Sequence, residues 1–270
     1  MLFAQRVIPL VLIFAVGCAS VPHTGRRQFN MIPDDKVNSL GAQAFNEVLA
    51  KEPEFTDKRI NEIVRRVADR VSRAAEEIDK PRFKWEVRLI DSDVPNAVCL
   101  PSGKILVFKG ILAYAKNEAG LAAIIAHEVA HAVARHASER LSQQLALRGI
   151  ASVGGELLKN QDGTLNQTSR LILGAFVLGG TLGVLLPYSR THEFEADRIG
   201  QIYMARAGYD PAESVRLWDR MAQIKKPPIP VWLSTHPADE ERLAELRRYL
   251  REAQEHYAKA PVKYGVGVPL

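Results

Sequence analysis

Apolar and polar residues follow two different periods in the first part of the chain, and each period predicts its own element. Within 57–78 the apolar residues recur at helical spacing: Ile60, Ile63, Val64, Val67 and Val71. Arginines occupy several of the remaining positions, as on the solvated side of an amphipathic helix, and contact with lipid headgroups is the alternative. Residues 34–49 predict an earlier helix, for which Asp34 or Asp35 can be the N-cap.

A period of two replaces the helical period over 83–89, where apolar residues alternate with charged ones. This pattern predicts a half-buried strand. Two shorter strands are expected at 97–100 and 104–108, because the Pro-Ser-Gly sequence at 101–103 between them is typical of a turn.

Helices are expected again after these strands, over 117–147, from Asp210 onward and over 237–258. The uncharged stretch 171–186 is interrupted by glycines and is short for a membrane span, so we expect a buried helix or an apolar lid beside the active site. The order of the expected elements is helices, then a small sheet, then further helices. This order predicts an α+β fold that is mainly helical.

The composition is that of a globular chain, with 270 residues, 47% hydrophobic and 25% charged. The net charge of +5 comes from basic residues interleaved with acids, so no basic stripe predicts nucleic-acid binding, and an anionic membrane surface is modestly favoured. The chain has 2 cysteines, Cys18 and Cys99, which excludes a disulfide-rich scaffold.

The N-terminus resembles the signal peptide of a bacterial lipoprotein. An apolar run, shorter than the roughly 20 residues of a membrane span, ends in Ala-Val-Gly-Cys18, which resembles a lipobox. We expect residues 1–17 to be a signal peptide, Cys18 to carry a lipid anchor and 18–33 to form a polar tether. Plain secretion with an incidental Cys18 is the alternative. Ala19, rather than aspartate, follows the cysteine, and this favours a periplasm-facing lipoprotein of the outer membrane over the inner.

The sequence His127-Glu128-Val129-Ala130-His131 carries the clearest chemistry in the chain. Residues four apart lie on one helical face, so both imidazoles can point at a single Zn²⁺ ion. Glu128 projects about 100° around the helix from His127, and it can reach a water at the metal without binding the metal itself. A chance match on a core helix is the alternative, but it would bury polar groups without partners.

A zinc hydrolase of this kind needs a third protein ligand. One class of zinc peptidases places a histidine six residues after the second one, with a glycine midway, but here those positions are Ala137 and Ala134. His136 lies about 140° around a continuous helix from His131, so we expect it at the surface.

Glu193 and Asp197 offer the missing groups, because they are four apart and share a helical face. Glu193 can bind zinc, and Asp197 can accept the outer N–H of a ligating histidine and so fix its tautomer. An ordinary helix acid is the alternative for Glu193. Glu195 and His192 point elsewhere and are expected at the surface or at a helix flank.

These two motifs, followed by Thr235-His236-Pro237, resemble the zinc metallopeptidase family that includes the CAAX prenyl proteases and HtpX. The likeness is closest to periplasmic and lipoprotein members such as LoiP and BepA. It covers roughly 34–257 and implies one gluzincin-type metallopeptidase domain with one zinc ion per chain, which we place at 34–260. The tail 261–270 is left without a role. The chain has no convincing membrane spans, so prenyl-protein processing is not expected.

The resemblance also implies roles for two residues near the C-terminus. The histidine that corresponds to His236 can approach the zinc and hold a latent state, whereas the sequence alone is equally consistent with a helix-entry residue. Arg242 matches an arginine near that histidine and can stabilise the oxyanion of the tetrahedral intermediate. Pairing at the surface of a charged helix is the alternative for Arg242, and we favour it.

The expected reaction is hydrolysis of a peptide bond, with Glu128 as general base and then as proton donor to the leaving amine. We expect the substrate to extend along an edge strand formed by Asn96, Ala97, Val98 and Cys99, bound through its main chain. Such binding suits unfolded or misassembled envelope proteins, and so predicts a quality-control protease. The alternatives are a chaperone or assembly factor with latent proteolysis, and a zinc hydrolase of non-peptide bonds.

Overall fold

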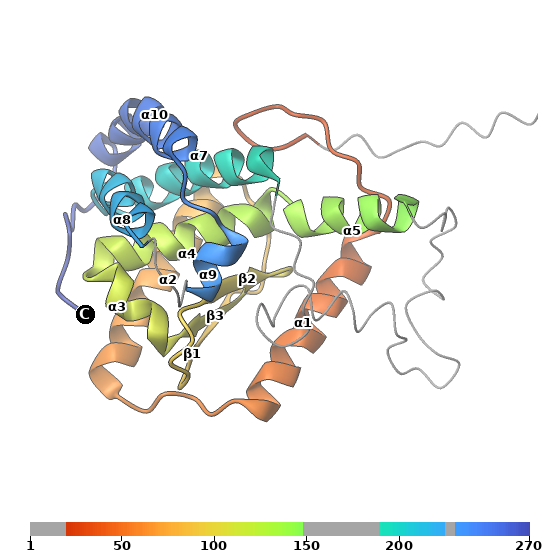
Figure 1. The fold of residues 1–270 in the computed structure, drawn as a ribbon, viewed down its shortest axis with the longest axis horizontal. Coiled ribbons are helices and arrows are strands. Elements are labelled where there is room, and N and C mark those ends of the chain that lie inside the picture. The colour runs from red at the N-terminus through yellow and green to blue at the C-terminus, as the bar shows by residue number, and fades with distance from the viewer. Residues whose placement is uncertain (1–19, 148–188, 225–229) are drawn as a thin grey trace, which may run out of the picture.

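The computed structural model describes residues 20–147, 189–224 and 230–270. Over these ranges helices surround a small sheet, which confirms the predicted α+β class (Figure 1). The helices are α1 (Asp34–Lys51), α2 (Lys58–Ile78), α3 (Leu112–Ala115), α4 (Glu118–Val133), α5 (His136–Leu147), α7 (Arg190–Arg206), α8 (Ala212–Ala222), α9 (Val231–Thr235) and α10 (Glu240–Ala258).

The sheet consists of β1 (Glu86–Ile90), β2 (Ala97–Leu100) and β3 (Lys104–Phe108), in the order β1-β3-β2. β1 pairs with β3 in parallel and β2 pairs with β3 antiparallel, and the bounds predicted for β2 and β3 are confirmed. The first strand begins at Glu86 rather than at Phe83. The reason is that Glu76 of α2 accepts hydrogen bonds from the Phe83 N–H and the Trp85 indole N–H, which holds this stretch outside the ladder.

α4 is the central helix, and nearly all of its residues are buried between α2, α7, α8 and β2 (Figure 1). The side chain of Asn117 caps it by accepting a hydrogen bond from the Gly120 N–H at 2.8 Å. α7 can lie close along it because Gly200 has no side chain, and a Cβ there would come within 3.0 Å of the His127 backbone nitrogen. The histidine motif is therefore held on a rigid, buried element.

The C-terminal tail completes the start of α4. The carbonyl oxygens of Val268 and Val266 accept hydrogen bonds from the N–H groups of Glu118 and Ala119, both at 3.0 Å. The first N–H groups of a helix have no partner within the helix, so the tail satisfies two of them. This gives residues 261–270 a place in the fold that the sequence left open.

The expected continuous helix over 117–147 is wrong, because the chain forms two helices that meet at Ala134 and Arg135. Arg135 adopts φ 56°, a left-handed conformation that cannot continue a helix. The break redirects the chain so that α5 begins at His136, which is completely buried. The expectation of a surface position for His136 fails for the same reason, since it assumed an unbroken helix.

Residues 20–33, which we expected to form a polar tether, pack against the folded domain instead. Ser20 and Arg27 pair across a tight turn, and Val21, with an exposed fraction of 2%, belongs to the main core. The side-chain amide of Gln28 donates to the carbonyl of Ala134 at the break between α4 and α5. This N-terminal segment is therefore anchored to the domain by its own apolar and polar side chains.

Some of the sequence-based expectations lie outside the described residues. These include the signal peptide 1–17, Cys18 and the apolar stretch 171–186. Within the described ranges, none of the helices has the length and apolarity needed to cross a bilayer.

Candidate metal centre

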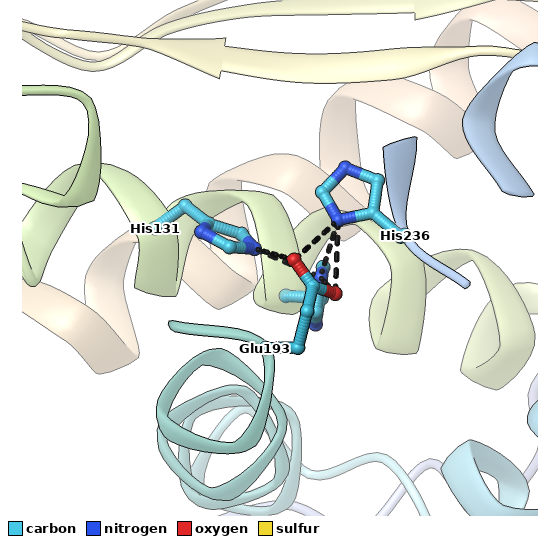
Figure 2. Close-up of side chains that lie close together, drawn as sticks. His131, Glu193 and His236 are labelled. Atoms are coloured by element: carbon cyan, nitrogen blue, oxygen red, sulfur yellow. Dashed lines mark hydrogen bonds and ion pairs between the residues drawn. The ribbon is translucent and has the colours of Figure 1, made fainter. Parts of the chain in front are cut away.

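Four side chains from three parts of the chain meet beside α4. His127 and His131 come from α4, Glu193 from the first turn of α7, and His236 follows α9 directly. One ligand atom of each lies within 4.8 Å of all the others, and all four residues are buried. Figure 2 shows the rings of His131 and His236 directed at the carboxylate of Glu193. The structure thus brings together the three ligands expected from the sequence, and His236, whose approach to the metal the resemblance implied, lies with them.

The ligand atoms are spaced as the corners of a metal site would be. The Nε2 atoms of His127 and His131 are 3.0 Å apart, and His127 Nε2 lies 3.2 Å from His236 Nδ1. Glu193 is 3.4 Å from the Nε2 atoms of both α4 histidines and 3.0 Å from His236 Nδ1. The corners of a tetrahedron around zinc, with Zn–N bonds of about 2.0–2.1 Å, are about 3.3 Å apart. The spacing fits one zinc ion.

The protons of the two α4 imidazoles lie on the far side of each ring. His127 Nδ1 is 2.9 Å from Asp197, whose carboxylate can only accept, so the Nδ1 of His127 carries the proton. His136 directs its Nε2 at the Glu195 carboxylate at 3.1 Å and its Nδ1 at His131 Nδ1 at 2.9 Å. His131 therefore donates to His136. With a metal bound, the Nε2 atoms of His127 and His131, 3.0 Å apart, would both direct a lone pair at it, which is the donor set that a cation needs.

Asp197 is held in turn by a buried arginine. Arg242, with an exposed fraction of 2%, pairs with both oxygens of Asp197 at 2.6 and 2.8 Å and with Glu193 at 2.8 Å. Its guanidinium stacks on Trp218 at 3.5 Å from the ring centroid. Burial alone would raise the pKa of Glu193, but His236 and Arg242 hold it well below its usual value. The alternative of surface pairing for Arg242 is therefore wrong, and on this geometry Arg242 positions two carboxylates.

Glu128 lies next to the four ligand atoms without being one of them. Its Oε1 accepts a hydrogen bond from the Trp232 indole N–H at 2.6 Å and lies 3.4 Å from His236 Nε2. Both partners belong to α9 or follow it, and α9 lies across the front of α4 and the sheet (Figure 1). Trp232 and His236 therefore lie against this oxygen of Glu128.

A second polar cluster lies behind His131 and is equally buried; its members are His136, Glu139, His192 and Glu195. Glu139 accepts from His192 Nε2 at 2.9 Å, and Arg26 of the N-terminal segment pairs with both glutamates. Burial alone would raise the pKa values of the two glutamates, but Arg26 and the histidines lower both to about 2. Surface positions for His192 and Glu195 are therefore wrong, because charged partners replace water around them.

β2, expected to bind substrate, pairs only with β3 in the described sheet and so forms one of its edges. The Phe108 N–H donates to Asn96, and because alternate pairs of an antiparallel ladder are hydrogen-bonded, the main-chain groups of Ala97 and Cys99 face outward. The thiol of Cys99 is buried, and burial together with Glu128 raises its pKa well above the usual value. A cavity of about 420 Å³ adjoins this edge, lined in part by Phe83, Cys99, Pro101 and His131.

Sequence reasoning did not find several residues that complete the site. Trp218 and Trp232 have the spacing of ordinary helix residues, and nothing local connects Arg26 with His136. A buried-network role for His136 could have been suspected only if the helix break at Arg135 had been foreseen.

Comparison with known proteins places this site in a family. The model of peptidase family M48 matches residues 56–250. Similar proteins include the mitochondrial metalloendopeptidase OMA1 of Schizosaccharomyces pombe, 35% identical over 242 residues, or 87% of this chain and 67% of that protein. Human OMA1 is 30% identical over 181 residues, 64% of this chain and 33% of that protein. The beta-barrel assembly-enhancing protease of Yersinia pestis is 25% identical over 242 residues, 87% of this chain and 48% of that protein. The chain thus spans 33% to 67% of the length of these relatives.

Proposed function

The chain belongs to peptidase family M48 and carries the zinc metalloendopeptidase domain of that family, and we propose that it cleaves unfolded or misassembled proteins of the cell envelope. The observation that carries this proposal is the buried meeting of His127, His131 and Glu193 with Glu128 directly beside them. A pure binding module has no need of a carboxylate placed there.

His127, His131 and Glu193 would hold the zinc ion. When bound, zinc supplies Lewis-acid chemistry, because it polarises the carbonyl of the bond to be cleaved and makes water a better nucleophile. Asp197 keeps the proton of His127 on Nδ1, so that Nε2 is free to bind a metal. Arg242 keeps both Asp197 and Glu193 ionised and in place.

Glu128 performs the proton transfers in this proposal. Its carboxylate accepts a proton from the attacking water and then delivers it to the leaving amine. The Trp232 indole N–H fixes one carboxylate oxygen, and the other is left to face the water. His236, 3.4 Å from the same oxygen, has to move for water to enter between them.

The substrate would add to the outward edge of β2 as an extended strand. The main-chain groups of Ala97 and Cys99 would hydrogen-bond to it, and the adjoining cavity would accept a side chain. Recognition through main-chain groups depends little on sequence and requires an extended chain, which unfolded proteins provide. This is the basis for proposing quality control as the biological role.

The proposed location is the envelope of a bacterium, through a lipid anchor at Cys18, with the outer membrane as the site of attachment. The support is the lipobox-like sequence before Cys18 and the likeness to a beta-barrel assembly-enhancing protease, whereas other relatives are mitochondrial by name. Labelling with radioactive palmitate in a bacterial host should mark the full chain but not Cys18→Ser. Absence of label from both would contradict the anchor.

A second candidate function is that of a chaperone or assembly factor whose proteolysis is latent. The observation that favours it is His236, which completes a set of four ligand atoms and leaves no position for water. In this state the edge of β2 could still bind extended chains. His236→Ala should raise peptidase activity if latency of this kind operates, and it should leave binding of unfolded chains unchanged.

The test of the main proposal uses the full chain with verified zinc content. Unfolded casein and a stably folded protein of similar size are incubated with the wild type and with Glu128→Gln. We expect the wild type to cut casein, to spare the folded protein, and to lose activity with chelator. Equal cleavage by Glu128→Gln would contradict the role of Glu128, and equal cleavage of the folded protein would contradict the substrate class.

A further inference from the structure

We propose that Arg26, in the N-terminal segment, is a positioning residue for the metal ligand His131, acting through Glu195 and His136. This inference rests on the zinc site of the proposed function but assigns a role to residues outside that site. It connects the stretch of chain just after Cys18 with the metal centre.

The connection is a chain of short contacts that leads from the ligand outward. His131 Nδ1 is 2.9 Å from His136 Nδ1, and His136 Nε2 is 3.1 Å from Glu195 Oε2. A carboxylate fixes the proton of His136 on Nε2, which leaves its Nδ1 as the acceptor for the proton of His131. Glu195 thereby determines, through His136, that the Nε2 of His131 is available to bind metal.

Arg26 holds Glu195 in the orientation that this arrangement needs. Its Nε and Nη2 donate to the two oxygens of Glu195 at 2.8 and 3.0 Å, and Thr24 donates to the same carboxylate at 2.9 Å. The other edge of the guanidinium donates to both oxygens of Glu139 at 2.8 and 2.7 Å. One planar guanidinium thus orients two buried carboxylates at once, which a lysine cannot do.

Glu139 supports the same histidine from its other face. It accepts from His192 Nε2 at 2.9 Å, and the His192 ring stacks on His136 with centroids 4.4 Å apart. Without Arg26, two carboxylates with exposed fractions of 4% and 5% would lose the cation between them. The guanidinium would then no longer fix their orientation, and Glu195 would no longer hold His136 as an acceptor for His131.

The same arrangement occurs on the other α4 ligand, which supports a positioning role over a purely structural one. His127 donates to Asp197, and Asp197 accepts from two of the three guanidinium nitrogens of Arg242. Each α4 histidine is therefore supported by a carboxylate that an arginine orients. For His127 the carboxylate is in direct contact with the histidine, whereas for His131 it acts through His136.

The experiment measures zinc affinity of the full chain by competition with a chromophoric chelator, together with thermal unfolding of the zinc-free protein and the absorption bands of the cobalt form. The variant is Arg26→Gln, and the matched control is Arg198→Gln. Arg198 also makes a two-pronged, partly exposed pair, with Glu252 at 2.8 and 3.0 Å, but has no contact with the ligands. We expect Arg26→Gln to weaken zinc binding by about 10- to 100-fold and to alter the cobalt bands. Arg198→Gln should do neither.

Several outcomes separate this inference from the proposed function. Unchanged zinc affinity in Arg26→Gln, even with a lowered unfolding temperature, would overturn the inference and leave the peptidase proposal standing. A wild type that binds no zinc would overturn both. If Arg26→Gln does not fold, Thr24→Val, which removes only one hydrogen bond to Glu195, decides instead. It should weaken zinc binding measurably, and an affinity equal to that of the wild type would again overturn the inference.

Discussion

The two α4 histidines are supported by arrangements of similar chemistry but different placement in the fold. Behind His127, Asp197 and Arg242 come from α7 and α10 and have exposed fractions of 4% and 2%. Behind His131, the final arginine is Arg26, whose side chain is 28% exposed and belongs to the N-terminal segment. One support lies wholly within the core, and the other ends in a partly exposed arginine of the N-terminal segment.

This difference has consequences for stability and for regulation. A buried ion pair that loses one partner leaves an uncompensated charge, whereas a partly exposed pair can recruit water. We therefore expect the His127 side to be needed for folding and the His131 side to be adjustable in the folded protein. Loss of the Arg26 contacts should therefore change metal binding without unfolding the domain.

The largest effect should come from Arg242→Gln. Removing this guanidinium leaves Asp197 and Glu193 buried without their cation, so the free energy of unfolding should fall by about 3–5 kcal/mol. Urea unfolding of the zinc-free protein measures this loss. An equal loss of stability in Arg26→Gln, measured in parallel, would contradict the proposed difference between the two supports.

A smaller effect is expected from Asp197→Asn, which leaves the side-chain volume nearly unchanged. The amide oxygen can still accept from His127 but without a full charge, so zinc affinity should fall by about 10- to 100-fold. Chelator competition measures the change. Glu195→Gln should weaken zinc binding less, since it acts on His131 only through His136, and the reverse order would contradict the comparison.

The smallest effect should appear in the salt dependence of the two arginine variants. The Debye length falls from about 10 Å at 0.1 M salt to about 3 Å at 1 M. Salt should therefore reduce the stability difference between Arg26→Gln and the wild type, since this pair is partly exposed. The difference for Arg242→Gln should stay constant over the same range of sodium chloride, and parallel behaviour of both variants would show that the two supports are equally shielded.

The sequence predicts those parts of the site that depend on local periodicity. His127 with His131, and Glu193 with Asp197, are each four apart on one helix, and helical geometry alone places each pair on a common face. The first and last residues of β2 and β3 could be predicted because a short turn joins the two strands. The position of Glu128 beside the ligands follows from the same helical geometry.

The rest depends on contacts between distant segments, which periodicity cannot reveal. The helix breaks at Arg135 because this residue is left-handed, and no feature of the sequence predicts that conformation. As a result, His136 lies in the core rather than at the expected surface position. Arg26 and Glu195 are separated by 169 positions, so their pairing follows from the tertiary fold. Polar residues such as His192 were expected at the surface because hydropathy is assigned residue by residue. It takes no account of opposite charges that pair with one another in the interior.

The central claim, that Glu128 carries the proton transfers at a zinc centre of this chain, is tested most directly by one measurement. The rate of casein cleavage is compared between wild type and Glu128→Gln, each shown beforehand to contain one zinc ion per chain. We expect full zinc content in both proteins and a rate lower by about 10²- to 10⁴-fold in the variant. A zinc-loaded Glu128→Gln that cleaves casein at the rate of the wild type would contradict this claim.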